Sequence, residues 1–256
     1  MQMDKSLNLT WEITYNHKPC LLKKYISLER FEAELKYIPI FEKAGFNVPK
    51  IELVEKKKRQ IIFEKIQGEK FEYFEKEKLA LCIAELAKIF KAFSNKQSQV
   101  TAKKYPEKVF KNIILYAKNN SLIIKKEVLK KLIDELKKYF KTSIFKDAKP
   151  TNWIFQKNKV YLIDFDYVVP SFFLADLAQL VTYQRRWHSL DIKKYLNMLL
   201  IKTIPSALVK NYLQPFTLAM INSNIMSQRY NPNLSKDTIK IFIKQNNELL
   251  KQLNIL

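Results

Sequence analysis

Two neighbouring stretches decide how this sequence is interpreted: Ile144–Asn152, which reads IFKDAKPTN, and Tyr161–Asp166, which reads YLIDFD. In the first stretch, Asp147 is followed five positions later by Asn152, and in the second a short apolar run ends at Asp164. One carboxylate can orient an attacking hydroxyl, while the amide and the other carboxylate offer the hard oxygen ligands that Mg²⁺ prefers. The two stretches therefore predict a site for phosphoryl transfer.

The first quarter of the chain is predicted to contain short strands and one helix. Trp11–Tyr15 and Cys20–Tyr25 are β-prone runs that are separated by a turn signal. Apolar residues recur at helical spacing over about Glu29–Lys43, with Ser27 as the expected N-cap and Gly45 just beyond the end. These features predict a small β-rich lobe.

Helical patterns dominate the rest of the chain, after a predicted hairpin that joins Lys50–Val54 to Gln60–Phe63 and after a break at Gly68. Helices are expected over Leu79–Phe93, Glu127–Tyr139, Ala175–Tyr183, Ile192–Ile201, Ala207–Ser227 and Thr238–Leu253. A loop and a strand pair, Ser143–Phe155 and Val160–Phe165, interrupt them. We therefore expect an α+β fold with two lobes, a β-rich lobe over residues 1–67 and a larger, mostly helical lobe over residues 68–256.

The composition excludes several kinds of site. The chain has only two glycines, which rules out a Gly-rich phosphate loop and a dinucleotide-binding turn. Its two cysteines, Cys20 and Cys82, lie far apart in the sequence, so neither a disulfide framework nor a cysteine zinc site is expected. With only His17 and His188, a multi-histidine metal site is not expected either.

The net charge of +21 would suit a polyanionic partner, but its make-up points to solvated surfaces. Only five of the 46 basic residues are arginine, the residue whose planar fork binds phosphate with two hydrogen bonds. No specific nucleic acid is therefore expected as a partner, and nucleic-acid binding is the least favoured function. The chain shows neither an apolar signal segment at its start nor a run of about 18 apolar residues. We expect a cytoplasmic protein without a membrane span.

At the level of motifs, the chain resembles the protein-kinase-like superfamily. FKDAKPTN is similar to the catalytic loop of that superfamily, and IDFD stands where its metal-binding motif would stand. Asp176-Leu177-Ala178 then matches the small-molecule branch, the aminoglycoside phosphotransferase and choline kinase group. Asp176 follows only twelve positions after Asp164, and no A-P-E motif follows, which disfavours a protein substrate. The resemblance covers roughly residues 11–185 and implies the two-lobed kinase fold.

The resemblance implies roles for residues in the two motif stretches. Asp147 would be the catalytic base or would orient the acceptor hydroxyl, and Lys149 would lie near the γ-phosphate. Asn152 and Asp164 would bind Mg²⁺, and Asp166 would assist the metal site. Asp176 would brace the catalytic loop.

Further roles fall in the first lobe. Lys23 would contact the α- and β-phosphates and pair with Glu34, and Lys24 is an alternative that would face the other side of the strand. Glu64 and Ile66 belong to a stretch that resembles the hinge between the lobes, where the nucleotide would bind. A turn over Lys5–Leu9 could cover the phosphates without glycine.

The resemblance thus implies an ATP- and Mg²⁺-dependent kinase that phosphorylates a hydroxyl of a small molecule, such as an amino alcohol, an aminoglycoside or a sugar. Two departures support an alternative, a kinase-like binding or regulatory protein with weak or no activity. The Gly-rich nucleotide loop is absent, and Phe145-Lys146 replaces the usual histidine before Asp147. His188, next to Arg185-Arg186-Trp187, could line a substrate pocket or end a solvated helix. Neither the acceptor nor the oligomeric state follows from the sequence.

Overall fold

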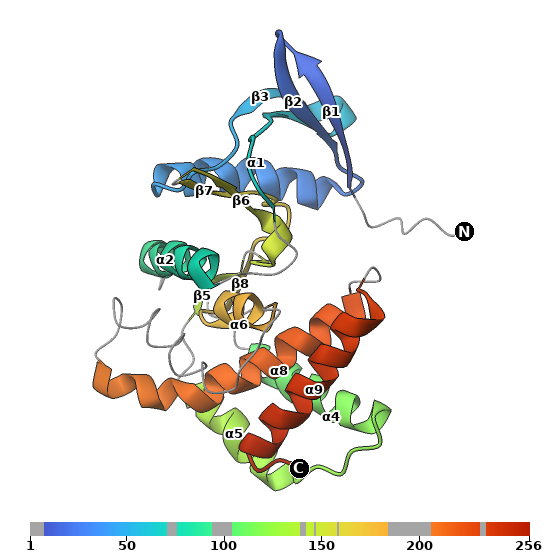
Figure 1. Cartoon of the computed structure of the whole chain (residues 1–256), viewed down its shortest axis with the longest axis vertical. Helices are drawn as coiled ribbons and strands as arrows, with labels where there is room; N and C mark the ends of the chain where they lie inside the picture. Colours follow the sequence, from blue (N-terminus) through green and yellow to red (C-terminus); the bar gives the residue numbers. More distant parts are fainter. Residues whose placement is uncertain are drawn as a thin grey trace. The chain divides into compact units, whose positions relative to one another are not determined.

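A computed structural model describes residues 8–70, 76–93, 104–138, 142–145, 147–157, 159–183, 206–230 and 234–256 (Figure 1). The chain forms two compact units. Unit 1 consists of Met1–Glu72 together with Lys149–Val168, and unit 2 consists of Tyr73–Ala148 together with Val169–Leu256. The segment that carries Asn152 and Asp164 therefore packs with the N-terminal residues, far from it in sequence.

Unit 1 is built on a four-stranded antiparallel sheet in the order β1-β2-β4-β3. Its strands are β1 (Leu9–Tyr15), β2 (Lys18–Lys24), β3 (Ile51–Glu55) and β4 (Gln60–Glu64). Both turn residues between β1 and β2, Asn16 and His17, have positive φ, as the tightest hairpin turns require. In the register of the sheet, Lys23 lies opposite the fully buried Ile61, so its side chain stands on a partly covered face.

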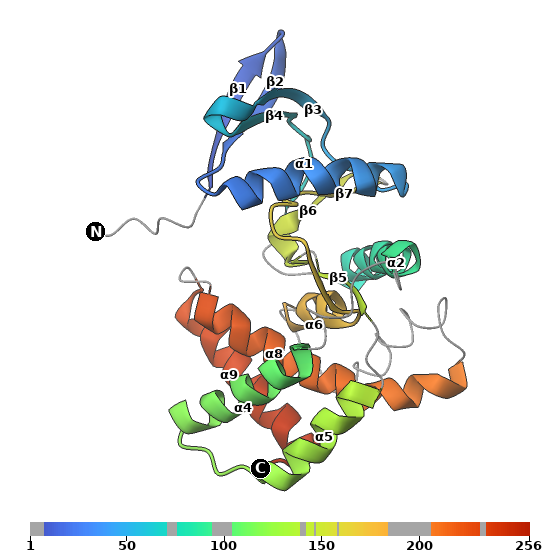
Figure 2. The same ribbon diagram turned by 180° about the vertical axis from the view of Figure 1, so that it is seen from behind.

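Helix α1 (Leu28–Lys43) begins and ends as its sequence predicts. Ser27 accepts a hydrogen bond from the Arg30 backbone N–H, and Gly45 beyond the last turn has a φ of 86°. The buried side of α1 is apolar except for one charged residue, Glu34. The ring of Phe41, on that buried side, lies 4.8 Å from the ring of Phe165. The helix therefore contacts the second motif stretch (Figure 2).

A second hairpin, β6 (Trp153–Gln156) and β7 (Lys159–Leu162), joins unit 1 through isolated bridges from Asn47 to Tyr161 and from Glu69 to Phe155. At Gly68, an added Cβ would lie 2.6 Å from the carbonyl oxygen of Phe155. The absence of a side chain at Gly68 lets the two backbones approach, which holds the motif stretch against the first lobe.

Unit 2 is mostly helical. Its helices are α2 (Lys76–Phe93), α4 (Tyr105–Asn119), α5 (Lys126–Lys138), α6 (Ala175–Thr182), α8 (Leu213–Tyr230) and α9 (Lys236–Gln252). Two short strands, β5 (Thr142–Phe145) and β8 (Val169–Phe172), pair with each other. β5 includes the first residues of the first motif stretch, and β8 follows the second stretch. All eight residues of α6 are buried, which makes it the central helix of this unit.

The structure corrects parts of the expected layout. The helix α4 was not predicted, although Pro106 in its first turn and the buried spacing of Val109, Ile113 and Tyr116 are helical signals. The helix expected over Ala207–Ser227 begins as a 3-10 helix, Ser206–Tyr212, before α8. The β5–β8 pair was also missed, because two four-residue strands carry little periodicity.

Two other expectations have different outcomes. The α+β class, with a small antiparallel sheet first and a helical part after it, is confirmed. The helix expected over Ile192–Ile201 lies outside the described residues, and the lobe boundary between residues 67 and 68 stays a prediction. Over the part of the chain that the structure describes, no helix has the length and apolar character for crossing a membrane.

Candidate active site

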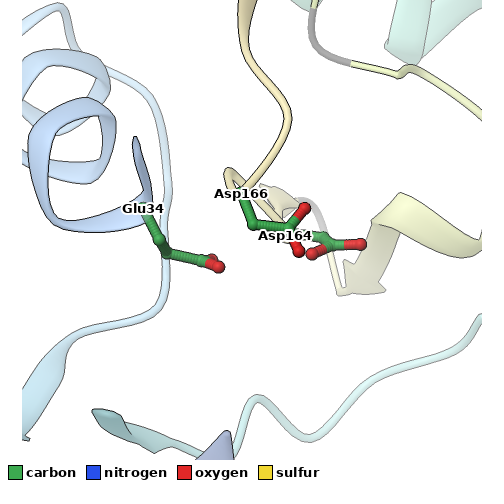
Figure 3. Close-up of side chains that lie close together, drawn as sticks. All are labelled: Glu34, Asp164 and Asp166. Carbon is green, nitrogen blue, oxygen red and sulfur yellow. The ribbon is translucent and has the colours of Figure 1, made fainter. Parts of the chain in front are cut away.

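Unit 1 contains a compact acidic cluster, which consists of Glu34, Asp164 and Asp166 (Figure 3). One carboxylate oxygen from each residue lies within 4.8 Å of one from each of the others. The ammonium group of Lys23 joins them: its Nζ lies 2.6 Å from Glu34 Oε2, 2.5 Å from Asp164 Oδ1 and 3.6 Å from Asp166 Oδ2. The structure thus brings together four residues that the sequence analysis assigned to nucleotide or metal binding.

Local structure holds Glu34 in place within this cluster. Its side chain is almost completely buried, and the backbone N–H of Phe165 donates to Oε1 at 3.0 Å. The hydroxyl of Tyr25 donates to Oε2 at 2.7 Å, and the ring of Tyr25 lies 5.0 Å from the Lys23 Nζ. A buried carboxylate needs such partners to stay charged. Glu34 therefore links α1 to both the lysine strand and the motif stretch.

Burial and the neighbouring charges shift the pKa of Lys23 and the pKa of Asp166. Burial alone would lower the pKa of Lys23, but the charges of Glu34, Asp164 and Asp166 outweigh it and raise the pKa above its ordinary value. Burial, together with the neighbouring charge of Asp164, raises the pKa of Asp166 to about 6. The cluster thus holds excess negative charge that Lys23 only partly offsets.

The backbone at Asp164 is in the left-handed region, with a φ of 66°. Aspartate and asparagine tolerate this conformation better than other residues with a side chain. Asn152 is buried, and its backbone carbonyl oxygen accepts a hydrogen bond from the backbone N–H of Ile163 at 3.1 Å. The two expected metal ligands are therefore tied together through the residue that precedes Asp164.

These residues fit a divalent cation of the Mg²⁺ type. The cluster offers three carboxylates, all hard oxygen donors, around a single ammonium group, that of Lys23. Asp164 and Asp166 could supply carboxylate ligands, and Asn152 could supply an amide oxygen. Glu34 was predicted to pair with Lys23 rather than to bind a metal, and its three hydrogen-bonding partners agree with that role.

The predicted catalytic residue Asp147 belongs to unit 2, where α6 holds it. Its backbone φ is 64°, again left-handed. The side-chain Nε2 of Gln179 donates to Asp147 Oδ1 at 2.5 Å, and the backbone N–H of Ala148 donates to Asp176 Oδ1 at 3.1 Å. Asp176 therefore contacts the catalytic loop through a hydrogen bond, as a structural brace would.

The other predicted residues lie at several places in unit 1. Lys149, half-buried, precedes the 3-10 helix Pro150–Asn152, and its carbonyl accepts from the Asn152 N–H at 3.0 Å. Glu64 ends β4, and its Oε1 accepts from the Lys50 N–H at 2.9 Å. Ile66 follows β4 and is half-buried, whereas Lys24 is exposed. None of these four residues is one of the three carboxylates of the acidic cluster.

Sequence reasoning missed several partners of the site. Asn8 donates to Asp166, and the guanidinium of Arg30 lies 3.8 Å from the same carboxylate. Tyr25 and Gln179 were missed too. Of these two residues, only Gln179 had a signal in the sequence, because it follows Asp176 by three residues and so lies on the same helix face. Residues 5–7 of the expected turn over Lys5–Leu9 lie outside the described residues. All of Arg185–His188 lies outside them as well.

Comparisons with solved structures support the kinase fold. An ethanolamine kinase from Plasmodium vivax is 15% identical, with a TM-score of 0.59 over 94% of this chain and 79% of that chain. A choline kinase from Streptococcus pneumoniae is 15% identical, with a TM-score of 0.58 over 96% and 89%. A microcompartment-associated aminopropanol kinase is 12% identical, with a TM-score of 0.60 over 97% and 89%. At these identities the similarity shows the fold.

The sequence itself gives the family. No curated protein matches it closely enough to indicate a relative. Residues 4–201, however, match the phosphotransferase enzyme family, and this range contains the acidic cluster, Asp147 and the Asp176-Leu177-Ala178 motif. The chain belongs to the phosphotransferase enzyme family.

Proposed function

We propose that this protein is an ATP- and Mg²⁺-dependent kinase that transfers a phosphoryl group to a hydroxyl of a small molecule. The observation that carries the proposal is the cluster around Lys23, whose Nζ contacts both Glu34 and Asp164. A lysine held by a helix glutamate is the arrangement that kinases use for nucleotide phosphates. It occurs here in a member of a phosphotransferase family.

The proposed roles follow the chemistry of each group. Lys23, fixed by Glu34, binds nucleotide phosphate. Asp164, Asp166 and Asn152 hold Mg²⁺, which when bound offsets the negative charge on the transferred phosphoryl group. Asp147 accepts a hydrogen bond from the acceptor hydroxyl and orients it for attack. Each of these roles is one of positioning or of charge stabilisation, which phosphoryl transfer needs above all.

An amino alcohol is the acceptor class that we favour. The three solved structures above are kinases of ethanolamine, choline and aminopropanol, all amino alcohols. Tyr167, directly after the IDFD motif, is 47% exposed, and an exposed aromatic ring can contribute to binding a cationic amine. Aminoglycosides and sugars are the other two classes to be tested.

The experiment measures ADP release by the purified protein with MgATP and a panel of amino alcohols, aminoglycosides and sugars. We expect acceptor-dependent ADP release with at least one amino alcohol and a phosphorylated product in mass spectrometry. Asp147→Asn should abolish transfer but keep ATP binding, because Asn tolerates the left-handed backbone at this position. Asp134→Asn, on the exposed side of α5, is the matched control.

Two outcomes would count against the proposal. If MgATP at millimolar concentration does not bind, as measured by calorimetry, the enzyme function fails. If MgATP binds but no member of the panel is phosphorylated, the alternative of a kinase-like binding protein is favoured.

A further inference from the structure

We propose that Gln179 is a positioning residue that orients the carboxylate of Asp147 for the acceptor hydroxyl, an inference that rests on the proposed function. Gln179 lies on α6 and is 8% exposed, and its Nε2 donates to Asp147 Oδ1 at 2.5 Å. No motif used in the sequence analysis includes this residue.

One turn of α6 contacts the catalytic loop twice. Asp176 and Gln179 are three residues apart and therefore lie on the same helix face. Asp176 accepts from the backbone N–H of Ala148, and Gln179 donates to the side chain of the preceding residue, Asp147. The first contact holds the backbone beside the left-handed Asp147, and the second selects the direction of its carboxylate. Because α6 is entirely buried, both contacts come from a rigid support.

The chemistry of an amide suits this role. A neutral N–H donor fixes the direction of a carboxylate without cancelling its charge, whereas a lysine or arginine would pair with the charge and weaken its pull on a hydroxyl proton. Asp147 is held by an amide, and its role in the proposed function is to accept a hydrogen bond.

The other end of Gln179 argues against a purely stabilising role. Its Oε1 is buried and has no hydrogen-bond partner among the described residues. A buried carbonyl oxygen without a partner costs stability. The hydrogen bond to Asp147 is then the favourable interaction of this side-chain amide. If the residue served stability alone, a nonpolar side chain of the same length would stabilise the fold at least as well.

The test compares three variants with the wild type in the ADP-release assay. Gln179→Met keeps the length of the side chain but removes the donor. We expect kcat to fall about 10- to 100-fold, because misplacing a reacting group by about 1 Å can cost this much. KM for ATP should change less than about twofold, since the nucleotide groups are untouched. The melting temperature should stay the same or rise.

Gln179→Glu tests the role through the pH dependence of kcat, which a purely structural role would not change. A glutamate at this position can donate to Asp147 only when protonated, and otherwise it places a second negative charge beside it. The kcat of this variant relative to the wild type should therefore rise as the pH falls from 8 to 5.5. The control is Gln245→Met on α9, where a buried glutamine accepts from Asn224. This control should leave kcat unchanged at every pH, whatever it does to the melting temperature.

The outcomes separate this inference from the proposed function. If the wild type is active and Gln179→Met keeps its kcat, or if Gln179→Glu shows no relative gain at low pH, the positioning role is wrong. If the wild type transfers no phosphate, the proposed function fails, and a positioning role in catalysis fails with it.

The contact itself is tested by NMR of the side-chain amide of Gln179, which is assigned by its loss in Gln179→Met. The signal should shift in Asp147→Gly, a substitution that suits the left-handed backbone. An unchanged signal would show that the hydrogen bond to Asp147 does not form in solution, whether or not the protein is an enzyme.

Discussion

The carboxylates of unit 1 contact an ammonium group, and the Asp147 carboxylate of unit 2 accepts a hydrogen bond from a neutral amide. In unit 1, Glu34, Asp164 and Asp166 surround the ammonium of Lys23, and the pKa of Asp166 is raised to about 6. In unit 2, Asp147 receives a hydrogen bond from the neutral amide of Gln179. Crowded carboxylates suit the binding of cations, because a metal relieves their repulsion. A hydrogen bond from a neutral amide fixes the direction of a carboxylate without adding a positive charge beside it.

The sharpest test of the metal side of this comparison is Asp164→Asn. We expect phosphoryl transfer to fall by about 10³-fold or more, because a divalent cation loses a charged ligand at the point where negative charge develops. Asn keeps the left-handed backbone at this position, so folding should be preserved. ADP release and calorimetric titration of Mg²⁺ into the ATP complex measure the effect. Activity within tenfold of the wild type would contradict the assignment of Asp164 as a ligand.

The second test replaces each lysine of β2 in turn. Lys23→Met should lower kcat/KM for ATP about 10²-fold, because a charged hydrogen-bonding group to phosphate is lost. Lys24→Met, at the exposed neighbouring position, is the matched control and should change kcat/KM less than twofold. If the two variants lose equal activity, the phosphate-binding role does not belong to Lys23 alone.

The third test uses pH to measure the repulsion in the cluster without metal. The pKa of Asp166 is about 6 in the folded chain against an ordinary value of 3.8, so the folded state holds this proton more tightly. Its effect on stability is therefore favourable at low pH and is lost as the pH rises from about 4 to 6. Asp166→Asn should raise the free energy of unfolding at pH 8 by about 1–3 kcal/mol, and this gain should shrink towards pH 4.5.

Urea unfolding with EDTA, or with Mg²⁺, measures this prediction. Added Mg²⁺ should stabilise the wild type more at pH 8 than at pH 5, since protonation of Asp166 removes one charged ligand. Equal stabilisation at both pH values would show that Asp166 is not part of the metal site.

The last test concerns the backbone that carries the second motif stretch. Gly68→Ala should lower the free energy of unfolding by about 1–3 kcal/mol, because its Cβ would clash with the carbonyl oxygen of Phe155. Gly45→Ala is a useful comparison: its added Cβ meets nothing within 4 Å, so only the strain of a φ of 86° remains, about 1 kcal/mol. Urea unfolding compares them, and ADP release should fall only for Gly68→Ala, since β6 precedes Asp164.

Much of unit 1 could be predicted because its signals are local. Ser27 and Gly45 mark the ends of α1, and the two short strands around the basic run form the expected hairpin. Helix α4 carried an equally local signal that was overlooked. The start of the Ala207–Ser227 segment as a 3-10 helix could not be predicted, because 3-10 and α-helices share almost the same apolar spacing.

The sequence by itself determined the motif residues, their spacing and hence the family, since Asp147, Asn152 and Asp164 are close neighbours in the chain. Only the tertiary structure decided the partners. Lys23 is 141 positions from Asp164, and Gln179 is 32 positions from Asp147. Pairing over such separations depends on how sheets and helices pack, and no local pattern encodes it. The same packing distinguishes Lys23 from Lys24, because one strand residue turns toward the buried Glu34 while the next turns to solvent.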